Sequence, residues 1–305
     1  MSLVLGATLL VGTSCEDQSC RDALQAAQTA ADTALKSVTA KQDELIAVKG
    51  SLTAAQTELA KVRKDLEAAK ASVDPGPEDS LEALRKSKIC NEPVLYSQVK
   101  EEVLIRHFFN DKENGFFLDV GCSDYKNIST TYYLEKHLHW KGIGVDAIGK
   151  YAADYLKYRP GTRFRNYAVS NHSGGTIDFY TEDGYEVFSS TVKEAIFRIP
   201  KPVTVKVPVI TLNDLLKKEK VNHIDFLSMD IEAGEIKALE GFDIKKYRPL
   251  LVCIEVQPEM GTYFANEISN YFQNNGYEKM EAYTQFEGAS NWYFKPKGYQ
   301  RKDKN

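Results

Sequence analysis

A seven-residue repeat between residues 22 and 72 is the feature that most restricts how this chain can fold. Two series of positions, three and then four residues apart, run through the segment, and thirteen of their fourteen members are apolar. The series are Leu24, Ala31, Val38, Leu45, Leu52, Leu59, Leu66 and Ala27, Ala34, Lys41, Val48, Ala55, Val62, Ala69. A period of about 3.5 residues keeps one stripe against a partner helix only if the helices supercoil, so residues 22–72 are predicted to form an α-helical coiled-coil stalk.

Such a helix would leave its apolar stripe in water if it stood alone, so we expect a homo-oligomer formed through the coiled coil. Packing back onto the rest of the chain and a single solvated helix are the alternatives. Asp74-Pro75-Gly76-Pro77 ends the helix, because proline lacks a backbone donor and disfavours helix in the preceding residue. We therefore assign residues 73–93 to a linker and residues 94–305 to a globular domain.

The first 21 residues form a separate signal-like or anchor segment. Leu3 to Val11 is an apolar run, and the following Gly-Thr-Ser-Cys resembles a bacterial lipoprotein signal in which Cys15 would be lipidated. The segment has Gly12 where Leu is usual and contains no Lys or Arg before Cys15. A misassigned start codon and a frayed terminus are the alternatives. We expect a cytoplasmic protein that this segment could tether to a membrane, with lipoprotein export as the rival interpretation.

The rest of the chain has the pattern of an α/β protein. Short apolar segments alternate with helical ones, which predicts a Rossmann-like, doubly wound and mostly parallel sheet. Strands are expected at residues 116–120, 142–146, 162–169, 224–229 and 250–254, with a helix at 129–136. The formal charge of the whole chain is -4, so no electrostatic footprint for nucleic acid is present and none is expected as a partner.

Four of these five strands have an acidic residue at or near the carboxyl end, at the sheet edge where such folds bind ligands. Asp119 precedes the turn at Gly121, and Asp146 ends the second strand, where it can accept hydrogen bonds from a ribose diol. Ser123 and Asn166 complete the predicted cofactor-binding set. The turn lacks the Gly-x-Gly-x-x-Gly phosphate cradle, so S-adenosylmethionine suits it better than NAD. Helix capping by the two aspartates is the structural alternative.

Ordered sequence blocks extend this interpretation. They occur at residues 96–98, 117–122, 129–136, 140–143, 209–216 and 224–232, and continue at Glu235, 239–242 and 248–249. The second block reads Phe-Leu-Asp-Val-Gly-Cys and the sixth reads Ile-Asp-Phe-Leu-Ser-Met-Asp-Ile-Glu. Together the blocks resemble the FkbM family of S-adenosylmethionine-dependent methyltransferases over about residues 94–296. The chain departs from the family pattern at Cys122-Ser123, where Ala-Asn is usual, and at Ala233-Gly234, where Gly-Ala is usual.

The resemblance implies a class I methyltransferase fold and methyl transfer from S-adenosylmethionine to a hydroxyl oxygen of a sugar, glycan or natural product. Asp230 and Glu232 are expected to orient this acceptor or to accept its proton, with Glu235 as the third catalytic candidate and Glu255 as a further choice. These carboxylates could instead hold a divalent ion, although no dedicated metal centre is predicted. The alternative function is a membrane-anchored structural or interaction protein whose methyltransferase-like domain binds a ligand without turning it over.

Overall fold

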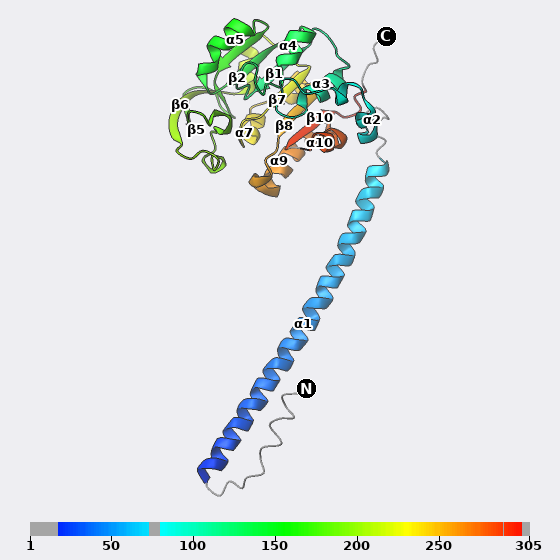
Figure 1. Ribbon diagram of the computed structural model, residues 1–305, viewed down its shortest axis with the longest axis vertical. Helices are drawn as coiled ribbons and strands as arrows, with labels where there is room; N and C mark the ends of the chain where they lie inside the picture. The colour runs from blue at the N-terminus through cyan, green and yellow to red at the C-terminus, as the bar shows by residue number, and fades with distance from the viewer. Residues whose placement is uncertain (1–17, 73–79, 289, 301–305) are drawn as a thin grey trace. The chain divides into compact units, whose positions relative to one another are not determined.

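The computed structural model describes residues 18–72, 80–288 and 290–300 (Figure 1). The chain divides into two units, residues 1–74 and 75–305, and each is described by itself. Residues 1–17, which hold most of the signal-like segment, and the predicted helix stop at residues 74–77 lie outside the described residues.

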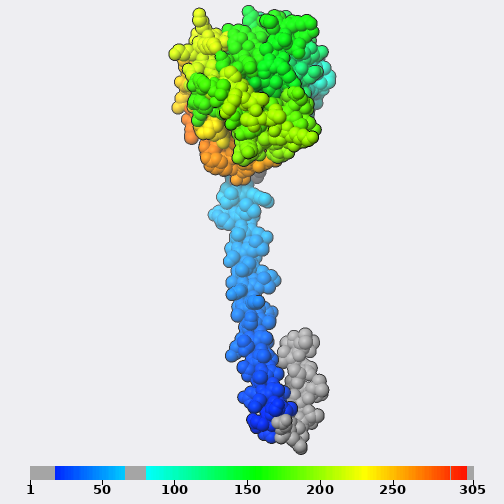
Figure 2. Space-filling view, turned by 90° about the vertical axis from the view of Figure 1, so that its left-hand side faces the viewer, coloured from blue at the N-terminus to red at the C-terminus, as the bar shows by residue number. Residues whose placement is uncertain are grey.

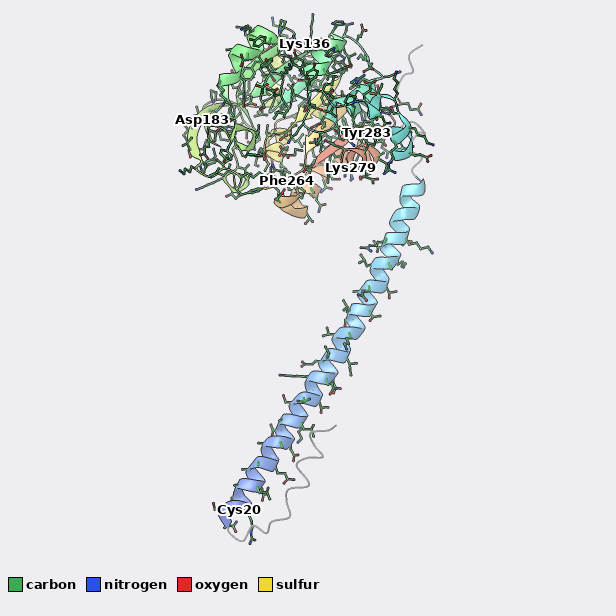
Figure 3. All side chains as sticks on the ribbon, viewed as in Figure 1. Cys20, Lys136, Asp183, Phe264, Lys279 and Tyr283 are labelled. Atoms are coloured by element: carbon green, nitrogen blue, oxygen red, sulfur yellow. The ribbon has the colours of Figure 1, made fainter. Side chains whose placement is uncertain are left out.

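The first unit contains the long helix α1 (Gln18–Ser72), so the predicted N-terminal helix is confirmed. Its 55 residues contain no proline, and Gly50 costs about 1 kcal/mol of helix stability without interrupting it. Members of the apolar stripe are exposed along the helix, with Leu45 53% and Leu52 56% accessible. Figure 3 shows the side chains of α1 projecting outward along the helix. Within the described ranges, no helix has both the length and the apolar character needed to cross a membrane.

The second unit is built on a seven-stranded sheet with the order β3-β2-β1-β7-β8-β10-β9. Pairing is parallel from β3 to β8 and antiparallel on both sides of β10. The strands are β1 (Phe116–Val120), β2 (Lys141–Asp146), β3 (Thr162–Asn166), β7 (Phe226–Met229), β8 (Leu251–Glu255), β9 (Tyr277–Lys279) and β10 (Asn291–Pro296). The predicted mostly parallel, doubly wound α/β fold is therefore confirmed.

Helices cover both faces of this sheet. They are α2 (Leu81–Lys86), α3 (Glu101–Phe109), α4 (Tyr132–Leu138), α5 (Ala152–Tyr158), α6 (Leu212–Lys218), α7 (Glu235–Glu240), α8 (Ile244–Tyr247), α9 (Gly261–Asn274) and α10 (Glu281–Glu287). Successive residues of one strand point to opposite faces, so Phe117 packs in the core formed with α2, α3, α4 and α10, while Leu118 packs in the core formed with α6 to α9. Burial on both faces explains why the strand sequences read as apolar runs.

The third predicted strand, residues 162–169, is divided between two sheets. Its first part is β3, whereas β4 (Ala168–Val169) joins β5 (Thr176–Thr181) and β6 (Val203–Ile210) in a small sheet of order β4-β6-β5. The division occurs at Tyr167, whose N–H donates to the carbonyl oxygen of Asp146 at the end of β2. Beyond this bond the chain leaves β2 and Ala168 pairs with Val209.

Two other elements differ from the expectation. Helix α4 begins at Tyr132 rather than at residue 129, and the hydroxyl of Thr131, the residue before it, donates to Asp119 and makes no helix cap. Part of the predicted linker at residues 73–93 is folded: Ser80 caps α2, and Leu84 is fully buried in the core. A helix of six residues carries too little periodicity to be recognised in a sequence.

Gly121 lies where the backbone after β1 closely approaches the backbone after β7. Its φ is +86°, and a Cβ atom built on it would lie 1.8 Å from the carbonyl oxygen of Asp230. The N–H of Asp230 also donates to the carbonyl of Val120 at 2.9 Å. The ends of β1 and β7 are therefore held together at a distance that only glycine permits.

We predict that Gly121→Ala lowers the free energy of unfolding by at least about 3 kcal/mol, because left-handed strain and a backbone clash act together. Gly184→Ala is the matched control, since Gly184 has the same φ of +86° but nothing within 4 Å of the added Cβ. Its cost should be only about 1 to 2 kcal/mol. Urea unfolding of both variants measures the difference, and equal costs would contradict the close approach.

Glu287 is a buried carboxylate in the second unit. It is 8% exposed, and Asn291 Nδ2 donates to its Oε1 at 2.7 Å while its Oε2 has no hydrogen-bond partner. Burial, followed by repulsion from Glu101, raises the pKa of Glu287 to about 8. Other groups near it are Tyr293 and Lys100. Folding therefore favours the protonated form.

The stability of the protein should fall as the pH rises from about 5 to about 8, because the folded chain keeps a proton on Glu287 that the unfolded chain releases near its ordinary pKa of 4.5. Glu287→Gln removes this contribution and should be more stable than the wild type by about 1 to 3 kcal/mol at pH 8, given about 1.4 kcal/mol per pKa unit. Denaturant unfolding at several pH values tests the change in slope. Glu281→Gln, at an exposed site of the same helix, should leave the slope unchanged.

Candidate active site

Two cavities lie side by side at the carboxyl edge of the sheet. The first is lined by residues that include Asp146, Ile148, Tyr167, Val169 and Phe179. The second is lined by five carboxylates, those of Glu101, Asp119, Asp230, Glu232 and Glu255. The two cavities share Gly121, Ser123, Val187, Asp230 and Glu232. The Gly121 turn thus separates a largely apolar pocket from an acidic one.

Part of the wall comes from the chain between β5 and β6. Val187 lines both cavities, and Arg198 is the one cationic residue that lines the acidic cavity among the described residues. Figure 2 shows this segment, in yellow-green, on the face of the second unit that is turned to the viewer. The hydroxyl of Ser190 donates to the carbonyl of Glu232 at 2.5 Å, so this segment is tied to the turn after β7.

Asp146 lies in the first cavity with both carboxylate oxygens oriented by the backbone. The N–H of Ser123 donates to Oδ2 and the N–H of Ile148 donates to Oδ1, each at 2.8 Å. Burial, opposed by these two bonds, raises the pKa of Asp146 to about 6, with a further contribution from the charge of Asp119. A carboxylate oxygen can accept more than one hydrogen bond, so Asp146 retains acceptor capacity toward a ligand.

Asp119 faces the second cavity and is held by a buried network. The hydroxyl of Thr131 donates to its Oδ2 at 2.7 Å, and Thr131 itself is contacted by the fully buried guanidinium of Arg159. Arg159 is paired with Glu135 at 2.5 Å, which satisfies a charge that would otherwise be costly to bury. Burial raises the pKa of Asp119 to about 6, while Thr131 and Arg159 act in the opposite direction.

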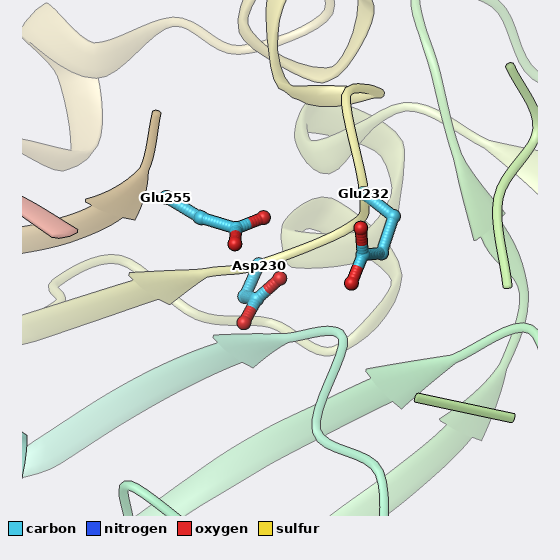
Figure 4. Close-up of side chains that lie close together, drawn as sticks. All are labelled: Asp230, Glu232 and Glu255. Atoms are coloured by element: carbon cyan, nitrogen blue, oxygen red, sulfur yellow. The ribbon is translucent and has the colours of Figure 1, made fainter. Parts of the chain in front are cut away.

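Three acidic side chains converge at the ends of β7 and β8. Asp230, Glu232 and Glu255 each place a carboxylate oxygen within 4.8 Å of the others (Figure 4). The pKa of Glu232 is raised to about 7, mainly by burial and then by repulsion from Asp230. The pKa of Glu255 is also raised to about 7, mainly by burial and then by repulsion from Glu232. The pKa of Asp230 is raised well above its ordinary value by enclosure and by the charge of Glu255. The Asp230 side chain is accessible in the cavity, so repulsion from the neighbouring carboxylates contributes more to this raised pKa than enclosure does.

The structure brings together most of the residues predicted from the sequence. Asp119, Gly121, Ser123, Asp146, Asp230 and Glu232 all line one or both cavities, as does Glu255. Gly121 belongs to the predicted cofactor-binding set, and the group that its missing side chain makes room for is the backbone of Asp230.

Two predicted residues line neither cavity. The amide nitrogen of Asn166 donates to the carbonyl oxygens of Asp146 and Ala147 at 2.9 Å, so Asn166 supports the turn after β2 from outside. Glu235 is fully buried, and its Oε1 accepts a hydrogen bond from the N–H of Ile231 at 2.8 Å. Burial raises the pKa of Glu235 to about 8. Both residues hold turns that present other side chains.

Sequence reasoning missed several residues of the site. Gln257 donates from its amide nitrogen to Glu232 and Glu255, and Glu101 reaches the acidic cavity from α3. Gln257 could have been found from its position two residues after β8. Nothing in the sequence near Glu101 or Arg198 places them beside the strand ends, because each comes from a separate segment that only the fold brings there.

Comparison with known proteins gives the family. A model of the methyltransferase FkbM domain matches residues 115–279, which is more than half of the 305 residues. No curated protein matches the chain significantly.

Among solved structures, the chain is similar to a TehB-like SAM-dependent methyltransferase from Corynebacterium glutamicum ATCC 13032 Kitasato, with 14% identity and a TM-score of 0.35, over 71% of this chain and 95% of that one. It is also similar to a geranyl diphosphate methyltransferase in complex with SAM, with 10% identity and a TM-score of 0.30, over 73% of this chain and 90% of that one. On the family match over residues 115–279, the chain belongs to the FkbM methyltransferase family.

Proposed function

We propose that this protein transfers a methyl group from S-adenosylmethionine to a hydroxyl oxygen of a sugar, glycan or other hydroxylated natural product. The observation that carries the proposal is the junction of the two cavities at Gly121, Ser123, Asp230 and Glu232. A pocket for a nucleoside and a pocket for a polar acceptor must share a wall if a methyl group is to pass between them. Membership of a methyltransferase family supports the same reaction.

The first cavity suits the nucleoside of S-adenosylmethionine. Asp146 accepts hydrogen bonds and would hold the ribose hydroxyls, while Tyr167, Val169 and Phe179 offer apolar surface for the adenine ring. The cofactor has no phosphate, which agrees with a turn that has an acidic wall instead of a phosphate cradle. S-adenosylmethionine supplies an electrophilic methyl group on a positively charged sulfur, and the carboxylates of the second cavity favour positive charge.

The second cavity suits a hydroxylated acceptor. Asp230 and Glu232 lie at the shared wall, so they would orient the acceptor hydroxyl and take up its proton. A carbon–oxygen bond forms, a carbon–sulfur bond breaks, and one proton is released for each methyl transferred. Glu255 completes the polar surface around the hydroxyl. Glu235 would act as a positioning residue, because it holds the turn that carries Glu232.

We expect the full-length protein to bind S-adenosylmethionine with micromolar affinity in calorimetric titration. Asp146→Asn should weaken binding by about tenfold or more, because it removes a charge-assisted hydrogen bond worth about 1.5 to 3 kcal/mol. Asp178→Asn is the matched control, because Asp178 is half-buried on β5, pairs with Lys206 and lines neither cavity. NAD should not bind. A folded protein that fails to bind S-adenosylmethionine would contradict the proposal and favour the non-catalytic alternative.

The acceptor is tested by transfer of a labelled methyl group. The protein is incubated with S-adenosylmethionine labelled on the methyl group and with a panel of hydroxylated glycans, and Asp230→Asn should lose turnover while keeping cofactor affinity. Incorporation into amines but not into hydroxyl compounds would overturn the choice of an oxygen acceptor.

We also propose that α1 forms a coiled coil with a second copy of the chain and that the protein acts in the cytoplasm, where S-adenosylmethionine is made. The exposed stripe that includes Leu45 and Leu52 supports the pairing, because an isolated helix would leave its apolar stripe in water. Membrane association through residues 1–21 would be an additional tether.

Sedimentation of the full chain should give the mass of an oligomer, and Leu45→Asp should shift it toward the monomer by placing a charge in the seam. Ile46→Asp is the matched control: Ile46 is 65% exposed and adjacent in sequence, but it lies outside the stripe. The control should remain oligomeric. A wild-type chain that sediments as a monomer at micromolar concentration would contradict the coiled coil.

A further inference from the structure

The spacing of the three carboxylates Asp230, Glu232 and Glu255 matches the size of a metal ion. Their facing oxygens all lie within 4.8 Å of one another. Oxygen ligands bind Ca²⁺ at about 2.3 to 2.6 Å, so two oxygens on opposite sides of one ion are about 4.6 to 5.2 Å apart, and slightly less for Mg²⁺ or Mn²⁺. Figure 4 shows Glu255 and Glu232 extending toward each other beside Asp230. One ion can therefore contact all three without a large movement.

The charge of this cluster is only partly balanced by the protein. Among the described residues, no ion pair with Lys, Arg or His is found for any of the three carboxylates. Arg198, on the wall of the same cavity, acts on Glu232 through its charge but is paired with the carboxylate of Glu259 at 3.6 Å. Glu101 and Asp119 add further negative charge to the cavity. Grouped carboxylates without a counter-charge repel one another, so the arrangement requires a cation or protons.

Gln257 provides an independent observation. It is 2% exposed, and its amide nitrogen donates to Glu232 and also to Glu255, at 3.1 Å to the latter. The oxygen of the same amide group is buried and has no hydrogen-bond partner. Buried polar atoms are almost always paired, and an amide oxygen is a ligand that hard divalent cations accept. The side-chain amide of Gln257 thus contacts two of the carboxylates through its nitrogen and has a buried, unpaired oxygen. This arrangement points to a positively charged ligand.

We propose that Asp230, Glu232 and Glu255, supported by Gln257, bind one divalent cation of the Mg²⁺, Mn²⁺ or Ca²⁺ type. All the ligands are oxygen atoms, and the set contains no His or Cys, which favours these hard ions over zinc or copper. Because Asp230 and Glu232 also line the wall shared with the first cavity, the ion would face the junction of the two cavities.

The site suggests what the acceptor presents, an extension that rests on the proposed function. Three carboxylates leave several coordination positions of a six- to eight-coordinate ion free, and two adjacent hydroxyls of a sugar can fill two of them. Such an ion would supply a positive charge that lowers the pKa of a bound hydroxyl, while Asp230, Glu232 and Glu255 would hold it beside the acceptor. We therefore infer an acceptor with a vicinal diol rather than an isolated hydroxyl.

The ion site is tested without turnover by titrating Mn²⁺ into the full-length protein and following free Mn²⁺ by electron paramagnetic resonance. The protein is first dialysed against a chelator and kept at 0.15 M salt to suppress binding at the surface. We expect one Mn²⁺ per chain with a dissociation constant below about 1 mM, displaced by Mg²⁺ or Ca²⁺. Glu232→Gln and Glu255→Gln should each weaken binding by about tenfold or more, because each removes an anionic ligand.

Glu259→Gln is the matched control, since it removes an exposed carboxylate that pairs with Arg198 and lines neither cavity. It should bind Mn²⁺ like the wild type. Mn²⁺ should also raise the unfolding temperature of the wild type but not that of Glu255→Gln. The cooperative unfolding transition of Glu255→Gln in this experiment shows that the variant is folded. Equal binding by the wild type and both cluster variants, or no binding at all, would overturn the proposal. Titration of S-adenosylmethionine into the same samples separates failure of the ion site from failure of the proposed function.

Discussion

The backbone contact between Gly121 and Asp230 is the constraint on which the rest of the site depends. Parallel pairing brings β1 and β7 together, but only the absence of a side chain at residue 121 allows the carbonyl of Asp230 to approach the first turn so closely. This contact places Asp230 and Glu232 on the wall that both cavities share. A larger residue at 121 would push the acidic turn away and disrupt the wall that the two cavities share.

Residues that depend on local sequence could be predicted, and residues that depend on long-range packing could not. The strands β1, β2, β7 and β8 lie within two residues of their predicted ends, because buried parallel strands are apolar runs with an acid at the carboxyl end. The acids Asp119, Asp146 and Asp230 were found for the same reason. Gln257, Glu101 and Arg198 were not, since their roles come from contacts across the fold. Asn166 and Glu235 have polar side chains at suitable positions in the sequence, but their hydrogen bonds direct them to turns instead of cavities.

Burying so many carboxylates at one sheet edge lowers stability in favour of function. The pKa values of Asp119 and Asp146 are raised to about 6 and those of Glu232 and Glu255 to about 7, chiefly by burial. Each raised value means that the ionised form is less favourable in the folded chain than in the unfolded one. A fold optimised only for stability would not retain this arrangement, so a positively charged ligand in the cavity is its simplest physical explanation.

The two departures from the family pattern fall at backbone positions that have the same unusual conformation. Ser123 has a φ of +47° and Ala233 a φ of +72°, both in the left-handed region, whereas Gly234 has an ordinary φ of -81°. The family usually has Asn at the position of Ser123 and Gly at the position of Ala233, and both tolerate the left-handed region better. For Ala in place of Gly, the conformational free-energy cost is about 1 kcal/mol or more. In this chain the left-handed conformation is therefore at residue 233, whereas the glycine is at residue 234. Long-range contacts such as the Ser190 bond to Glu232 impose the turn, and the acidic edge keeps its geometry against the local preference of its own residues.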